Sequence, residues 1–141
     1  MILLDTNVLS ELMRVAPEPR VLAWLDQLPA TDFWVSAITV AEIRLGIALL
    51  PDGRRRATLT SLAEQMFQED FAGRCLPFDQ EAARLYAEVV AFCTRLGRPI
   101  SVEDAQIAAI ALANRLTLAT RNTRDFEEVS GLALFDPWRA G

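Results

Sequence analysis

The chain has 141 residues, a length typical of one domain, and 52% of them are hydrophobic, which suits a sizeable core and argues against intrinsic disorder. Its formal net charge is −5, so direct binding of duplex DNA through a basic surface is not expected. The chain has no His, and all 14 of its basic residues are Arg, which excludes His-dependent catalytic relays, His-ligated zinc, and phosphate loops or Schiff bases that need Lys. Carboxylates, hydroxyls, Arg and two thiols remain for chemistry.

The two cysteines, Cys75 and Cys93, lack the spacing of metal ligands and are too few for a disulfide framework. They are predicted to be free thiols in a reducing compartment. No positively charged leader opens the chain, and its longest apolar stretch, 33–50, is interrupted by Glu42 and Arg44. Neither a signal peptide nor a membrane span is predicted, and a cytoplasmic protein is expected.

Short apolar runs alternate with helix-forming segments along the chain. Strands are predicted at residues 2–4, 33–35, 75–78, 116–119 and 132–135, the third weakened by a proline. Helices are predicted at residues 8–14, 19–28, 39–50, 54–71, 79–96 and 101–113. This alternation, without linkers or repeats, predicts a single α/β domain over residues 1–141, with a parallel sheet of four or five short strands and helices on both faces.

Acidic residues follow several of these strands or begin several of these helices. Asp5 ends the first strand, Glu42 and Asp104 lie in predicted first helical turns, and Asp125 follows the fourth strand. Ligands of parallel sheets bind at the carboxyl ends of the strands, where these acids would meet. Asp104 would join them only if the chain returned to that edge before its helix begins.

Each acid also has a purely structural explanation. Asp5 could cap the first helix, and Glu42 and Asp104 could complete capping boxes with Thr39 and Ser101. Taken together, however, clustered carboxylates repel one another, and a divalent cation relieves that repulsion. Mg²⁺ and Mn²⁺ prefer oxygen ligands, and such an ion activates water for attack on phosphate.

Four blocks of sequence, in order, resemble the PIN domain family, closest to VapC toxins and the related FitB proteins. The blocks are residues 2–8 (ILLDTNV), 36–43 (SAITVAEI, then Gly46), 100–108 (ISVEDAQIA) and 118–122 (LATRN, then Asp125-Phe126). The resemblance covers nearly the whole chain and implies a PIN-like three-layer α/β/α fold. It also implies a Mg²⁺- or Mn²⁺-dependent endoribonuclease that is the toxin of a type II toxin–antitoxin system.

The resemblance assigns the catalytic and metal-binding acids to Asp5, Glu42 and Asp104. The fourth acidic position of the family falls on Asn122, where this sequence departs from the usual Asp. Either Asn122 binds metal through its amide oxygen or Asp125 substitutes for it. One tightly held metal ion, or a second recruited with RNA, is therefore expected.

Four further residues beside this site are candidates for binding substrate. Arg121 and Arg124 flank it and could bind phosphate, while Thr6 and Thr120 could orient ligands or water, although both also suit local capping.

The resemblance implies a VapB-type antitoxin as partner, operator DNA bound only through that antitoxin, and a homodimer. An acidic pocket favours an antitoxin that inserts an Arg, because a guanidinium pairs with carboxylates and displaces metal. Its apolar contacts are expected near Leu12, Trp24 and the face formed by residues 59–66.

Two alternatives compete with a nuclease. One is a weakly catalytic or non-catalytic PIN module that mainly holds a DNA-binding partner, an interpretation that the substitution at Asn122 favours. The other comprises phosphatases and receiver domains that also carry an Asp after the first strand. Those classes need a Lys, and the phosphatases also need an Asp where this chain has Asn7, so the sequence argues against them.

Overall fold

Five short parallel strands form the centre of the molecule, in the order β3-β2-β1-β4-β5. The computed structural model describes residues 1–139. The strands are β1 (Ile2–Leu4), β2 (Phe33–Ser36), β3 (Cys75–Leu76), β4 (Thr117–Ala119) and β5 (Leu134–Phe135). The predicted parallel sheet is confirmed, and β1 is its central strand, so that Asp5 lies at the middle of the carboxyl edge.

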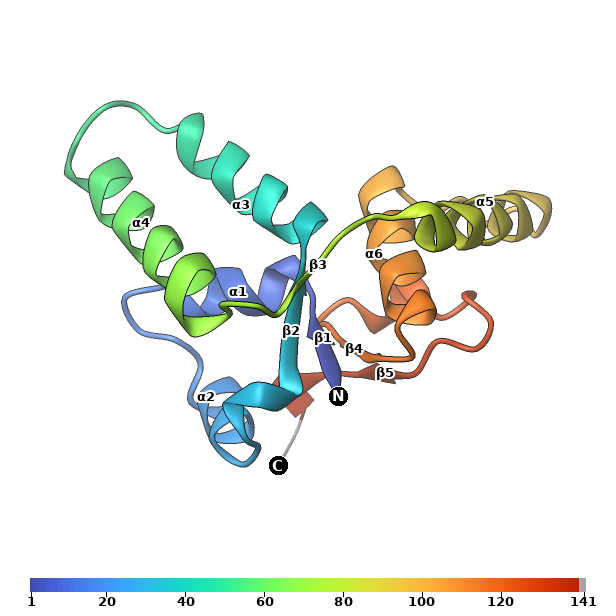
Figure 1. Cartoon of the computed structure of the whole chain (residues 1–141), viewed down its shortest axis with the longest axis horizontal. Helices are drawn as coiled ribbons and strands as arrows, with labels where there is room; N and C mark the ends of the chain where they lie inside the picture. Colours follow the sequence, from blue (N-terminus) through green and yellow to red (C-terminus); the bar gives the residue numbers. More distant parts are fainter. Residues whose placement is uncertain (140–141) are drawn as a thin grey trace.

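Helices cover both faces of the sheet, as Figure 1 shows. One layer comprises α1 (Thr6–Leu12), α2 (Pro19–Asp26), α3 (Ala37–Ala48) and α4 (Arg54–Gln65), and the other comprises α5 (Gln80–Arg95) and α6 (Val102–Ala113). Short helical turns are η1 (Ala30–Asp32), η2 (Met66–Asp70), η3 (Thr123–Phe126) and η4 (Pro137–Arg139). Each layer packs its own core: successive residues of β1 face opposite sides, so Leu3 joins the core under α5 and α6, and Leu4 joins the other.

The α3 helix begins earlier than the predicted capping box allows. Ser36, at the end of β2, is the N-cap, and its side-chain oxygen accepts a hydrogen bond from the Thr39 backbone N–H at 3.1 Å. The predicted box formed by Thr39 and Glu42 is therefore wrong, because the extended backbone of Ser36 already provides the cap. As a result Glu42 lies in the second turn, with its side chain free for another role.

The chain returns to the carboxyl edge of the sheet through the α5–α6 hairpin. Gly97, with φ of +76°, follows α5 and allows the reversal. Ser101 then caps α6, accepting from the Asp104 N–H at 3.2 Å, as predicted. The α6 helix is rich in buried alanines, whose small side chains let it pack closely. None of the helices within residues 1–139 is long and apolar enough to cross a membrane.

Candidate active site at the carboxyl edge of the sheet

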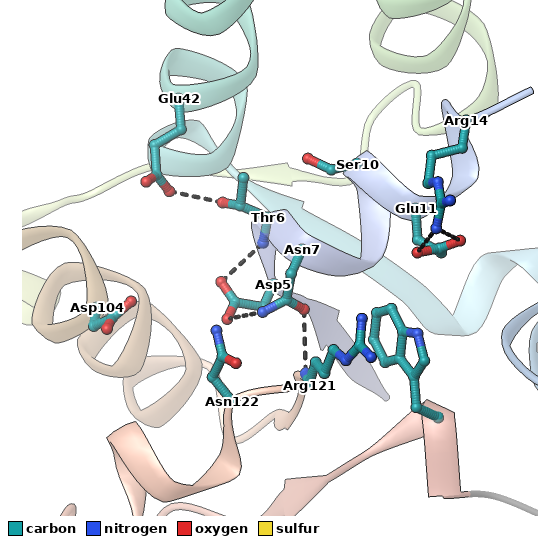
Figure 2. A pocket seen from close by; sticks show the side chains of 11 residues that line it. Asp5, Thr6, Asn7, Ser10, Glu11, Arg14, Glu42, Asp104, Arg121 and Asn122 are labelled. Atoms are coloured by element: carbon teal, nitrogen blue, oxygen red, sulfur yellow. Dashed lines mark hydrogen bonds and ion pairs between the residues drawn. The ribbon is translucent and has the colours of Figure 1, made fainter. Parts of the chain in front are cut away.

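A pocket of about 500 Å³ lies at the carboxyl end of β1 (Figure 2). Its lining comes from both helical layers, from the loop after β4 and from η4. The lining residues are Asp5, Thr6, Asn7, Ser10, Glu11, Arg14, Glu42, Asp104, Arg121, Asn122 and Trp138. The three acids predicted to be catalytic thus face one pocket, although they are separated by up to 99 positions in the sequence.

Asp5 is the most deeply held of these acids, with only 4% of its surface exposed. Its Oδ1 accepts from the Thr6 N–H at 2.8 Å, and its Oδ2 accepts from Thr120 Oγ1 at 2.7 Å and from Asn7 Nδ2 at 3.4 Å. The pKa of Asp5 is raised to about 6, mainly by burial and to a smaller extent by the charges of Asp104 and Glu42, against opposing hydrogen bonds from Thr120 and Thr6. Asp5 also caps α1, so its predicted structural role is confirmed for a carboxylate that lines the pocket.

Asp104 and Glu42 line the pocket beside Asp5. Partial burial raises the pKa of Asp104 despite an opposing hydrogen bond with Ser101, and the nearby charges of Asp125 and Glu42 act in the same direction as burial. Glu42 is held differently: its Oε1 accepts a hydrogen bond from Thr6 Oγ1 at 2.7 Å (Figure 2). The Thr6 hydroxyl also bonds Thr39 Oγ1 at 2.9 Å, so α1 fixes the direction in which Glu42 points.

The donor set of the pocket suits a hard divalent cation, since carboxylate and amide oxygens predominate around Asp5. Within residues 1–139, no three acidic or thiol side chains are close enough to form a complete set of ligands. Asp5 and Asp104 do interact electrostatically across the pocket. A cation that keeps several of its own waters, as Mg²⁺ does, needs only one or two carboxylates.

The remaining predicted site residues are divided between the pocket and its surroundings. Asn122 lines the pocket, whereas Thr120 is fully buried and hydrogen-bonds Asp5, which suits it to orient that carboxylate. Asp125 and Arg124, in η3, are not among the lining residues, although the charge of Asp125 raises the pKa of Asp104. Of the two positions proposed for a fourth metal ligand, Asn122 is therefore the better placed.

One face of α1 and the turn after it contribute pocket residues that were not predicted from the sequence. Asn7, Ser10, Glu11 and Arg14 all line the pocket. Their intervals of three and four are the period of a helix face, so the signal was present once Asp5 had been identified. Glu11 is only 5% exposed, and its carboxylate accepts hydrogen bonds from Arg14 Nη1 and from the Glu18 N–H at 2.9 Å.

Asn7 links the two central strands at the pocket. Its Nδ2 donates to Thr120 Oγ1 at 3.1 Å, and its Oδ1 accepts from the Arg121 N–H at 3.2 Å. The side chain of Arg121 extends over the ring of Trp138, 5.0 Å from the ring centroid. Trp138 was missed because it lies at the far end of the sequence, outside every local motif.

Residues 2–132 match the PIN domain family, and the chain belongs to that family. It is 48% identical to Toxin FitB of Neisseria gonorrhoeae over 138 residues, covering 98% of this chain and 99% of that protein. It is 44% identical to VapC ribonuclease Y4jK of Sinorhizobium fredii, covering 98% of each. Among solved structures, a chain of FitAB bound to an IR36 DNA fragment superposes with a TM-score of 0.91 at 46% identity, covering 100% of this chain and 98% of that one.

Proposed function

We propose that this protein is the endoribonuclease toxin of a type II toxin–antitoxin system and that it hydrolyses RNA phosphodiester bonds with Mg²⁺ or Mn²⁺. The observation that carries the proposal is the convergence of Asp5, Glu42 and Asp104 on one pocket, in a PIN domain 44% identical to a protein named as a VapC ribonuclease. Neither His nor Lys is available to supply catalysis by another route.

Asp5 and Asp104 would hold the metal ion, with Asn122 as a neutral third donor. The bound ion would lower the pKa of water and stabilise charge developing on the phosphate. Asp5 has a pKa of about 6, so at neutral pH it is mostly ionised and able to bind a cation. Glu42, whose carboxylate is oriented by the Thr6 hydroxyl, would accept the proton of the attacking water. Thr120 and Asn7 keep the Asp5 carboxylate in one orientation.

A VapB-type antitoxin is the proposed partner, and operator DNA would be bound through it. A second groove, of about 450 Å³, lies between α1, α2 and α4 and offers an apolar docking surface. Leu12, Leu62 and Met66 line it, within the region where antitoxin contacts were expected. Trp24 does not line it, because that side chain is buried in the core beneath. A homodimer stays a prediction.

A weakly catalytic module that mainly holds a DNA-binding partner is the second candidate. Two observations favour it: Asn122 replaces the usual acid, and the fold closely matches that of a chain in the DNA-bound FitAB complex. An amide contributes no charge to metal binding, so the affinity for a second ion would be low.

The test is incubation of the purified chain, freed of antitoxin, with total cellular RNA and Mg²⁺ or Mn²⁺. Discrete cleavage products, absent in Asp104→Asn and after chelation of metal, would support the nuclease. The matched control is Glu103→Gln, which removes a neighbouring charge outside the pocket lining. A stable complex with the product of the adjacent small reading frame, combined with no cleavage above that of Asp104→Asn, would instead favour the binding module.

A further inference from the structure

The guanidinium of Arg121 is held beside the acidic pocket by an aromatic ring. Its backbone is fixed at the end of β4, where its N–H donates to Asn7 Oδ1. Its side chain lies over the indole of Trp138, with the guanidinium carbon 5.0 Å from the ring centroid. Within residues 1–139, this guanidinium forms no ion pair, although carboxylates line the same pocket. Its N–H donors are therefore available to an incoming anion.

Trp138 is itself firmly placed. Its backbone N–H donates to Asp136 Oδ1 at 2.9 Å, and its backbone carbonyl accepts from Arg20 Nη1 at 3.3 Å. The half-buried indole packs against the core under α1 and α2. Its position lies beyond residues 2–132, the part that matches the PIN domain family. The C-terminal turn η4 thus adds an element to the pocket that the family match does not include.

We propose that Trp138 is a positioning residue that holds Arg121 as a phosphate-binding arm, so that Arg121 binds a phosphate of the RNA strand next to the one cleaved. This inference rests on the proposed function. A guanidinium binds two phosphate oxygens at once, and stacking on a ring restricts its rotamers without using any of its N–H donors. The pocket would thus have two charged parts: carboxylates that bind a metal ion, and the fixed guanidinium of Arg121 that binds the RNA backbone.

The test measures binding of a fluorescently labelled single-stranded RNA in the Asp104→Asn background, where cleavage does not consume the probe. We expect Trp138→Ala and Arg121→Gln each to weaken binding about tenfold and to lower the salt dependence by about one phosphate contact, a slope change of roughly 0.7. The double variant should be no weaker than either single one, because both remove the same contact. Trp138→Phe should retain most of the affinity, since a ring still supports the guanidinium.

Arg95→Gln is the matched control, because it removes an exposed arginine of α5 that does not line the pocket. In the cleavage-competent background, Trp138→Ala should raise KM about tenfold with little change in kcat. Unchanged affinity and salt slope in Trp138→Ala and Arg121→Gln would overturn the inference, as would a Trp138→Phe variant as weak as Trp138→Ala. If these variants bind RNA like the parent protein while the wild type cleaves RNA, the inference fails and the proposed nuclease activity is still supported. If RNA binding depends on Trp138 but the wild type does not cleave RNA, the nuclease proposal fails and the RNA-binding site is still supported.

Discussion

The two walls of the pocket are built in opposite ways. On one wall, Asp5, Glu42 and Asp104 project from the end of β1, from α3 and from α6. On the other, Arg14 and Arg121 project from the turn after α1 and from the loop after β4. Asp5 is buried and accepts three hydrogen bonds, whereas the Arg14 side chain is 64% exposed and bonds a single carboxylate.

The comparison of the two walls indicates that the acidic wall lowers the stability of the folded protein, whereas the basic wall does not. Holding Asp5 buried beside two other acids raises its pKa and disfavours its ionised form. The exposed arginines carry no such penalty, because water screens them. The acidic wall is therefore expected to dominate catalysis, and the basic wall to adjust affinity for substrate.

The largest effect is expected from Asp5→Asn and Asp104→Asn. Each change removes one charge from the proposed cation site while preserving side-chain size. RNA cleavage should fall by about 1,000-fold in each, since metal-assisted attack supplies several kcal/mol. Quantified product bands in Mn²⁺ provide the measurement.

Metal binding at the same acids can be measured by thermal unfolding. Mn²⁺ should raise the Tm of the wild type but not of the Asp5→Ala, Asp104→Ala double variant. An equal shift in both would rule out this cation site.

Glu42→Gln should lower kcat by about 100-fold, because it removes the proposed proton acceptor. Thr6→Val keeps the carboxylate and removes only the hydroxyl that orients it, so a loss of about fivefold is expected. Single-turnover cleavage rates separate this chemistry from product release. If both variants lost activity equally, Glu42 would act through the Thr6 network and not as a proton acceptor.

The stability of the acidic wall should depend on pH through Asp5. Its pKa is about 6 in the folded protein against an ordinary value of 3.8, so its favourable contribution is complete below pH 3.8 and is lost as pH rises through 6. Between pH 4 and pH 7 the loss should be about 2 kcal/mol, or about 30-fold in the unfolding constant. Urea unfolding of wild type and Asp5→Asn without metal provides the measurement. Parallel pH profiles for the two proteins would contradict the prediction.

Asn122→Asp should extend the acidic wall. An added carboxylate is expected to tighten metal binding by about tenfold, and to raise cleavage at limiting Mn²⁺ if a second cation limits the rate. The gain should disappear at saturating Mn²⁺, where occupancy no longer differs. Equal activity at every metal concentration would show that position 122 is not a ligand, and Asp125→Asn would then be the next variant to examine.

The smallest effect is expected on the basic wall. Arg14→Gln should weaken binding of single-stranded RNA by about threefold and reduce the salt slope by roughly 0.7, because an exposed cation contributes mainly through counterion release. Anisotropy of labelled RNA over a series of salt concentrations measures both. An Arg14→Gln loss as large as that of Asp5→Asn in cleavage would mean that the two walls do not differ as described.

Local sequence patterns predicted most of the fold. Apolar runs marked the strands, and Asp79 and Ser101 marked the starts of α5 and α6 because their caps depend only on neighbouring residues. The predicted start of α3 was wrong because two possible N-caps, Ser36 and Thr39, lie three residues apart. Ser36 is the N-cap because β2 ends there with an extended backbone. The helix predicted from residue 54 to 71 instead changes to a π-helical turn at η2.

The site was predictable to a similar extent and for similar reasons. Asp5 and Asp104 were found because each lies next to a recognisable strand end or helix start, and Glu42 because it lies in the helix that follows the second strand. The hydrogen bonds that orient these acids were not predicted. Asn7, for example, bonds Thr120, which lies 113 positions away, and no local pattern encodes that contact. The partnership of Arg121 and Trp138 was missed because an aromatic residue near a chain end has no distinguishing spacing.

The central position of β1 also determines when the pocket can form during synthesis. Residues 2–4 are made first, yet they pair with residues 117–119, and the Asp5 N–H donates to the Ala119 carbonyl at 2.9 Å. At ordinary elongation rates, the first strand waits on the order of ten seconds for that partner. A nascent chain therefore carries Asp5 without Asp104 or Asn122 for most of its synthesis. The acidic pocket is assembled only after residues 104 to 122 have also left the ribosome.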